Sequence, residues 1–457
     1  MTDFLKNLVD LAIDYGKGKT DSIIARVSKT KNAQVRFSQS KIDISKTWDA
    51  LQLELFVVVA SQKTGVSEIS ISGEDDVKRA IDGVVKFTGI LPDSMFFAGI
   101  EENTHKYTKL SENYDEGIDS FVEESPEIIN SVINQALNEG AKRAAGALMT
   151  TKVHSFFRSS MGPEGDSRKT TFDLNIRALQ DELDYSGQGL VCGTKPSESE
   201  KGLLEAGAKA GRLSKEAIGA VQGEPGKYDL VLNPTVGANV IGGVPVLANP
   251  IYIMMGLSPL GDRTGEQIAP ANLTVTEDSL FEGGLNSTPF DWEGTPSRET
   301  EIIEKGVYKS MLHNTSTAKM YETESTGSSR LAEIGRGAKM LLPDASNIVF
   351  NNGDYSLEEL LDTKRPTIYV TSNWYSRAQN YQTGEFSTIP RDAMFLIEKG
   401  ERKPIKNMRI SDNVMRMLAN IDAIGNDRMQ VYWWEVVTPT VIPSLRIRDC
   451  QMTAATQ

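Results

Sequence analysis

Cysteine and histidine are scarce in this sequence. Its 457 residues include two cysteines, Cys192 and Cys450, which lie far apart in the chain. A disulfide framework requires several closely spaced cysteines, so this pair argues against one and favours a reducing compartment. The three histidines show none of the i, i+4 spacing that brings two imidazoles to one face of a metal-binding helix.

Long hydrophobic runs are also lacking. The longest apolar stretch, residues 53–60, is interrupted by Glu54, whereas a membrane-spanning helix needs about 20 apolar residues. Residues 1–15 carry three aspartates and lack the basic segment and apolar core of a signal peptide. We therefore expect a cytoplasmic protein that does not associate with membranes.

Positive charge is in deficit. The sequence has 49 Lys and Arg against 62 Asp and Glu, a net charge of −13, and it contains no dense basic run. Nucleic-acid binding depends on clustered Lys and Arg, so direct nucleic-acid contact is not expected. Hydrophobic residues make up 39% and charged residues 24%, which is typical of a folded chain with a large core.

The first 225 residues show the same succession of patterns twice. Apolar residues recur at helical spacing, then alternate with polar residues as in strands, and then return to helical spacing. The first succession predicts a helix over 4–15, strands over 22–28, 33–38, 41–48, 51–60 and 66–72, and a helix over 75–88. After an irregular segment over 92–125, the second predicts a helix over 126–148, strands over 150–159, 168–183 and 189–193, and a helix over 198–221. Ser125 is a suitable N-cap for the 126–148 helix, with Pro126 at its first position.

Strand patterns dominate after Gly226. Helices are expected over 234–243 and 412–421, and strands over 228–233, 273–276, 302–308, 347–351, 367–372, 393–399 and 432–437. We therefore predict an N-terminal α/β domain, residues 1–225, and a β-rich C-terminal domain, residues 226–457. The predicted fold class is α+β, with tandem α/β units, antiparallel and partly barrel-like sheets, and a strand-rich C-terminal domain.

The histidines do not define a catalytic site. Glu101 and His105 are four residues apart and could give a metal one carboxylate and one imidazole, but their polar, Tyr- and Asn-rich surroundings favour surface residues. No metal-ligand partner stands at helical spacing from His154 or His313. A Ser-His-Asp triad with His313 would be expected to use a G-x-S-x-G turn, which the sequence lacks.

A free thiol is the other candidate nucleophile. Cys192 lies in a strand-like stretch over residues 187–193. A reactive thiol needs an electropositive setting and a nearby base, and no histidine lies close to Cys192 in sequence. A buried, inert cysteine is the favoured interpretation for Cys192 and for Cys450. An independent hydrolase that uses Cys192 stays open as an alternative.

Six short segments, taken in order, make the chain recognisable. They are GKYDLVLNP at 226–234, GEQIA at 265–269, FDWEGTP at 290–296, KGVY at 305–308, TGEF at 383–386 and IEKG at 397–400. Their order and spacing resemble the TldD/PmbA family, the "modulator of DNA gyrase" proteins. The two helix-strand-helix successions fit as well, so the resemblance covers nearly the whole chain.

The family has two branches, which differ in their metal ligands. TldD-like members are zinc peptidases with an H-E-x-x-x-H helix and a distant Cys ligand, whereas PmbA/TldE-like members lack these ligands. The stretch that matches the metal helix, residues 235–247, reads TVGANVIGGVPVL and contains no His, Glu or Cys. Pro245 would also break such a helix, and Cys450 lies beyond the position of the family's metal Cys. The resemblance therefore implies the PmbA/TldE branch, with no catalytic residue, metal ligand or cofactor in this chain.

The resemblance also implies a function. A PmbA/TldE-like chain would form a heterodimer with a TldD-like subunit, which alone would carry zinc, and the pair would degrade unfolded peptides or process peptide precursors. Main-chain pairing to strand edges would hold such peptides with little sequence preference. Besides the Cys192 hydrolase, a homodimeric peptide-binding module stays open as an alternative.

Overall fold

The N-terminal half of the computed structural model consists of two units with the same order of elements. The structure describes residues 2–261, 263–334 and 338–455. The first unit comprises α1 (Thr2–Gly16), β1 (Ser22–Ser38), β2 (Lys41–Val59), β3 (Lys63–Ser70) and α2 (Glu74–Gly89). The second comprises α3 (Ile118–Asn138), β4 (Arg143–Ser159), β5 (Glu164–Leu179), β6 (Ser186–Gly193) and α4 (Glu200–Glu216). The predicted tandem α/β units are therefore confirmed.

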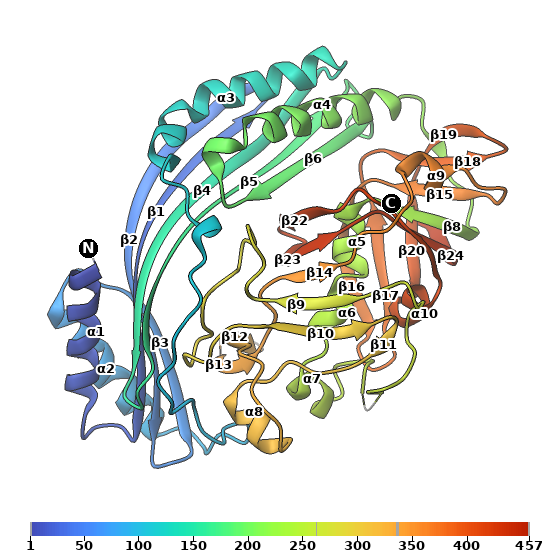
Figure 1. Ribbon diagram of the computed structural model, residues 1–457. Helices are drawn as coiled ribbons and strands as arrows, with labels where there is room; N and C mark the ends of the chain where they lie inside the picture. The colour runs from blue at the N-terminus through green and yellow to red at the C-terminus, as the bar shows by residue number, and fades with distance from the viewer. Residues whose placement is uncertain (1, 262, 335–337, 456–457) are drawn as a thin grey trace.

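The two units share one sheet. Its strand order is β3-β2-β1-β4-β5-β6, so the first strands of the units meet at the centre. There β1 and β4 pair antiparallel from Ile24 opposite Ser159 to Phe37 opposite Gly146. The long strands curve strongly and partly surround the C-terminal half of the chain (Figure 1).

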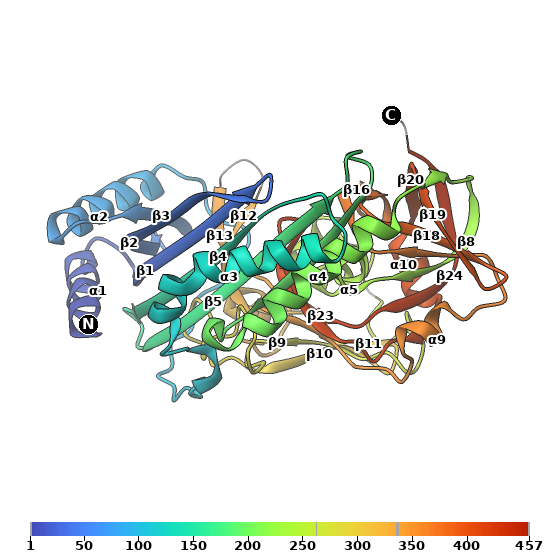
Figure 2. The same ribbon diagram turned by 90° about the horizontal axis from the view of Figure 1, so that it is seen from above.

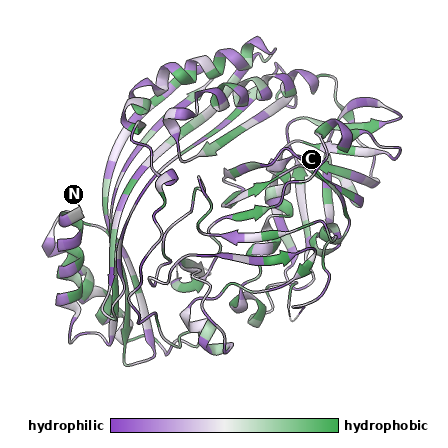
Figure 3. Ribbon diagram, in the orientation of Figure 1, coloured by the Kyte–Doolittle hydropathy of each residue, from purple (hydrophilic) through white to green (hydrophobic). Residues whose placement is uncertain are grey.

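The four long helices cover the outer, convex face of this sheet. Helices α1 and α2 lie over one end and α3 and α4 over the other (Figures 1 and 2). Hydrophobic and hydrophilic residues alternate along these helices, as expected when one face packs on a sheet (Figure 3). Close packing of α4 on β6 requires glycine, because a Cβ at Gly189 would lie 2.0 Å from the carbonyl oxygen of Ala206. The concave face carries none of these four helices and faces the C-terminal half of the chain (Figure 1).

The predicted helix over 126–148 is wrong at both ends. Helix α3 begins at Ile118 and ends at Asn138, and residues from Arg143 onward belong to β4. Ser125 is therefore not an N-cap, and Pro126 lies inside the helix. Pro126 has no N–H to donate to the carbonyl of Val122, and the hydroxyl of Ser125 donates to that carbonyl instead, at 2.8 Å. This local replacement makes an interior proline tolerable.

Strands dominate the C-terminal half, as predicted, and short helices connect them. The helices are α5 (Pro234–Val240), α6 (Gly243–Val246), α7 (Pro250–Met254), α8 (Thr315–Met320), α9 (Leu357–Leu361) and α10 (Val414–Ala419). The strands are β7 (Val221–Gln222), β8 (Gly226–Leu232), β9 (Val275–Asp278), β10 (Glu299–Glu304), β11 (Val307–Tyr308), β12 (Ser329–Ile334), β13 (Ala338–Pro343), β14 (Ile348–Phe350), β15 (Thr367–Val370), β16 (Asn373–Asn380), β17 (Glu385–Pro390), β18 (Met394–Glu398), β19 (Glu401–Lys406), β20 (Met408–Asn413), β21 (Ile421–Ile424), β22 (Met429–Trp433), β23 (Val436–Ile442) and β24 (Leu445–Ala454).

These strands form two large open sheets and a hairpin. The larger sheet has the order β16-β17-β20-β24-β8-β15-β18-β19-β7, with β21 also paired to β24. The second has the order β11-β10-β9-β14-β23-β22, and β12 pairs with β13 alone. The α+β class is confirmed. The predicted boundary at residue 225 falls in the loop between β7 and β8, both of which belong to the larger sheet. Within the described residues, no helix has the length and apolar character needed to cross a membrane.

Candidate functional site

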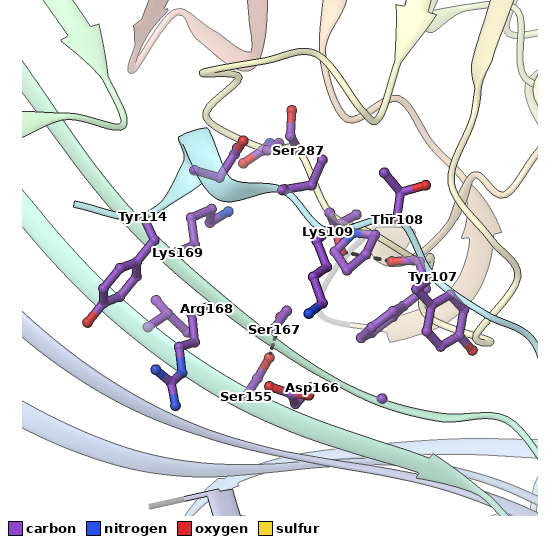
Figure 4. Close-up of a pocket in the computed structure, with 18 of the residues that line it drawn as sticks. Tyr107, Thr108, Lys109, Tyr114, Ser155, Asp166, Ser167, Arg168, Lys169 and Ser287 are labelled. Carbon is purple, nitrogen blue, oxygen red and sulfur yellow. Dashed lines mark hydrogen bonds between the residues drawn. The ribbon is translucent and has the colours of Figure 1, made fainter. Parts of the chain in front are cut away.

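The main candidate site is a cavity of about 1040 Å³ between the concave face of the N-terminal sheet and loops of the C-terminal half. Strands β1, β2, β4 and β5 form one wall, and residues 286–292 with Arg330 form the opposite one. Residues 107–116, which connect the two N-terminal units, close a third side. Lys109 extends from this connection toward Ser155 and Ser167, whose hydroxyl groups lie 2.8 Å apart on the sheet (Figure 4).

Three basic side chains in the cavity share an unusual environment. Arg26 donates to the backbone carbonyl of Asp291 at 3.4 Å, and Lys169 donates to the backbone carbonyl of Leu285 at 2.8 Å. Arg330 donates to its neighbour's carbonyl, Ser329 O, at 2.9 Å. Among the residues that the structure describes, no carboxylate forms an ion pair with Arg26, Lys169 or Arg330. We call these three residues the cavity cations.

The cavity cations are close enough to affect one another. Burial, together with the positive charges of Arg330 and Arg26, lowers the pKa of Lys169 to about 8. Burial also lowers the pKa of Arg26, and Arg330 acts in the same direction. Glu54 and Asp291 oppose that effect on Arg26. The site thus concentrates positive charge in a region of restricted solvent.

Aromatic rings fix the wall beside Arg26. The Arg26 guanidinium carbon lies 5.0 Å from the ring centroid of Trp292. The Phe290 ring packs between two others, 4.5 Å from Phe157 of β4 and 4.6 Å from Tyr107. The hydroxyl of Tyr107 donates to the carbonyl of Gly294 at 2.8 Å. The FDWEGTP segment is therefore held firmly against the N-terminal sheet.

Two acidic side chains of the same segment are buried. Asp291 accepts backbone N–H bonds from Glu293, Thr295 and Ser329. Glu293 accepts one, at 3.1 Å from Thr315 N, and its other carboxyl oxygen has no hydrogen-bond partner among the described residues. Burial raises the pKa of both carboxyls, and the charge of Asp291 raises that of Glu293 further.

The α5 region is the position that the family resemblance assigns to a zinc-binding helix. Here Asn233 caps the helix by accepting from Thr235 N at 3.2 Å. The Asn239 side chain accepts from Asn373 Nδ2 at 2.6 Å and donates to the carbonyl of Glu435 at 2.6 Å. The helix offers no thiolate, imidazole or carboxylate, and its amides are satisfied by other protein groups. The residues at this position therefore do not fit a zinc ion.

The structure places the three histidines in separate surroundings. His105 Nε2 lies 3.5 Å from Glu101, and His154 Nε2 lies 3.9 Å from Asp166. His313 is buried before α8, and burial lowers its pKa to about 4. The described residues contain no group of three or more His, Cys, Asp or Glu that could hold a metal ion. The histidines are thus not brought together.

Both thiols are unsuited to act as nucleophiles where they lie. Cys192 donates to the carbonyl of Gln430, with Sγ 3.4 Å from the oxygen, and burial raises its pKa well above the ordinary value. Burial raises the pKa of Cys450 to about 12. A thiolate is the reactive form, so neither site favours reaction.

Comparison with known proteins identifies a class and then a family. A family model described as "PmbA/TldA metallopeptidase C-terminal domain" matches residues 225–454, which is half of the chain. The protein is thus metallopeptidase-like in class. It belongs to the PmbA/TldD family, as the sequence resemblance predicted.

Individual relatives agree with this assignment. The chain is 26% identical over 375 residues to the metalloprotease MJ0996 of Methanocaldococcus jannaschii, covering 78% of this chain and 79% of that protein. It is 28% identical over 192 residues to a metalloprotease PmbA homolog of Buchnera aphidicola, covering 42% and 38% respectively. The structure of TldE from Thermococcus kodakarensis has the same fold, with a TM-score of 0.83, 19% identity and coverage of 98% of this chain and 99% of that one.

Proposed function

We propose that this chain is a non-catalytic, PmbA/TldE-like subunit that pairs with a TldD-like zinc metallopeptidase. The pair would degrade unfolded peptides or process peptide precursors, with zinc held by the partner alone. The observation that carries the proposal is the chemistry of α5. At the position of the metal helix, this chain has a neutral, hydrogen-bonded amide, Asn239, in place of metal ligands.

The contribution of this chain would be to hold the peptide. Strand β16 stands at one end of the ten-stranded sheet, and one of its edges has no partner strand among the described residues. It is also adjacent to α5, since its residues Asn373 and Ser376 both donate to Asn239 Oδ1. An open strand edge can bind an extended peptide through main-chain hydrogen bonds, which require little sequence preference. This property suits unfolded substrates.

Two alternatives predict different behaviour of the isolated chain. A homodimeric peptide-binding module would bind peptides without cleaving them, with or without a partner. An independent hydrolase would cleave them alone through Cys192. The half-buried position of Cys192 and the raised pKa of its thiol favour the subunit proposal over the hydrolase.

Co-expression with a TldD-like subunit from the same organism tests the proposal. The two chains should co-purify, and cleavage of unfolded casein should require both. Replacing a histidine of the partner's H-E-x-x-x-H motif should abolish cleavage while the complex persists. Cleavage by this chain alone would overturn the proposal, and so would full activity of the partner without it.

A further inference from the structure

We propose that the cavity cations, Arg26, Lys169 and Arg330, bind the terminal carboxylate of a peptide. The identity of the ligand as a peptide rests on the proposed function, whereas the anion site rests on the cavity alone. The site lies in the large cavity between the N-terminal sheet and residues 286–292, away from α5.

The first argument is the missing counter-charge. Each cavity cation is partly buried, and within the described residues its hydrogen bonds go to carbonyl or hydroxyl oxygens, such as Leu285 O for Lys169 and Ser279 Oγ for Arg330. Arg26 also lies over the Trp292 ring, and the charges of Glu54 and Asp291 act on it without an ion pair. Partly buried cations are normally paired with carboxylates, because desolvation without a counter-ion is costly. Grouping three of them adds mutual repulsion, which lowers the pKa of Lys169 in addition to the larger effect of its burial. A bound anion would remove both costs.

The second argument is the charge balance of the whole cavity. Five basic side chains line it, which are the cavity cations with Lys109 and Arg168. Four acidic side chains also line it among the described residues: Glu54, Glu116, Asp166 and Asp291. Counted over the described lining, the excess is one positive charge, which a monoanion such as a carboxylate neutralises. A phosphate dianion would leave an excess of negative charge beside these acids.

The third argument is the shape and lining of the cavity. Ligand sites usually measure about 300–1,000 Å³, so 1040 Å³ is far larger than a simple ion needs. The guanidinium groups of Arg26 and Arg330 have the planar fork that matches a carboxylate. Tyr107, Tyr114 and Trp292 add aromatic surface, and Ser155 and Ser167 add hydroxyl groups. This combination suits a carboxylate that is attached to a chain of several residues.

Isothermal titration of the isolated chain tests this inference. The probes are an acetylated hexapeptide of Ala, Ser and Thr with a free C-terminal carboxylate, the same peptide as a C-terminal amide, and inorganic phosphate. The free acid should bind at least 10-fold more tightly than the amide, and phosphate should compete weakly. Lys169→Gln and Arg330→Gln should each weaken binding of the acid about 10-fold and leave the amide unchanged. Lys209→Gln, which removes a half-buried lysine of α4 outside the cavity, should change neither.

Several results would overturn the inference. They are equal binding of acid and amide by the unaltered chain, stronger binding of phosphate than of the acid, or no binding of any probe. Because the acid and amide are compared on the unaltered chain, a variant that fails to fold does not affect this test. Lys169→Arg and Arg330→Lys, which keep the charge, should retain most of the binding. Cleavage by the co-expressed pair is a separate measurement. A negative binding result would therefore overturn the carboxylate site alone, and a negative cleavage result would overturn the subunit proposal alone.

Discussion

The side-chain amide nitrogen of Asn373 lies 2.6 Å from the side-chain oxygen of Asn239, joining the edge strand β16 to helix α5. Asn239 lies within residues 235–247, the stretch that the family resemblance matches to the metal helix, and Asn373 begins the neighbouring strand. Hydrogen bonds between uncharged side chains thus join these two elements. They also keep β16 in a fixed relation to the rest of the sheet.

Replacing Asn239 with alanine should destabilise the chain. The variant loses hydrogen bonds to Asn373, Ser376 and Glu435 and leaves buried polar groups less well satisfied. We expect the free energy of unfolding to fall by about 2 kcal/mol in urea titration. Asn138→Ala, at an exposed position at the end of α3, is the control and should change it by less than about 0.5 kcal/mol. Equal effects of the two variants would show that these hydrogen bonds contribute nothing.

Stability should depend on pH through Glu293. Its native pKa is raised above the ordinary value of 4.5 by burial and by Asp291, so the native state retains the proton to a higher pH than the unfolded chain does. The stabilising contribution of this group is therefore present below pH 4.5 and is lost as the pH rises toward the native pKa. Glu293→Gln, which resembles the protonated acid, should be more stable than the unaltered chain at pH 8, by an amount that shrinks toward pH 5. Urea midpoints at pH 5, 6, 7 and 8 measure this, with the exposed Glu282→Gln as control. A stability difference that is constant across this range would contradict the expectation.

The contact between α4 and β6 should not tolerate a methyl group. A Cβ at Gly189 would lie 2.0 Å from the backbone oxygen of Ala206, so helix and strand would have to separate. We expect Gly189→Ala to lower the free energy of unfolding by about 2–3 kcal/mol. Gly83→Ala is the matched variant, because it lies on α2 with no atom within 4 Å of the new Cβ. It should stabilise the chain by about 0.5–1 kcal/mol, and a loss of stability there would contradict this interpretation of the packing.

Cys192 should resist alkylation in the folded chain. The residue is half-buried, its thiol donates to Gln430 O, and its pKa is raised, so little thiolate is present at pH 8. Mass spectrometry after iodoacetamide treatment should find Cys192 unmodified in the native protein and modified in urea. Cys192→Ala should leave cleavage by the co-expressed pair within about 2-fold. Rapid labelling, together with loss of an activity that the chain shows alone, would support the Cys192 hydrolase instead.

The sequence predicts regular elements well where periodicity decides them, and less well where tertiary pairing does. The Ala-rich residues after Asn138 suit a helix by propensity, but pairing with β1 and β5 makes them the start of β4. Residues 22–28 and 33–38 were expected to be two strands, yet they form the single long strand β1. The single strand expected over 432–437 is instead the end of β22 and the start of β23, with a turn at Trp434 and Glu435 between them.

The cavity cations illustrate why the site is harder to predict than the fold. Arg26, Lys169 and Arg330 come from β1, β5 and β12, and more than a hundred residues separate each from the next. In sequence, each resembles an ordinary polar residue of a half-exposed strand. Only the curvature of the N-terminal sheet around residues 286–292 brings them to one cavity. In contrast, the lack of ligands in residues 235–247 could be read directly, because a metal helix has a fixed local spacing.

Native mass spectrometry with metal analysis is the most direct test of the proposed subunit role. It would count chains and zinc ions in the purified chain alone and in the complex co-expressed with a TldD-like subunit. We expect no zinc with the lone chain and one zinc ion per heterodimer, retained when Asn239 is replaced by alanine. Stoichiometric zinc bound by the lone chain would contradict the account, and its ligands would then have to be sought around His105, His154 and His313.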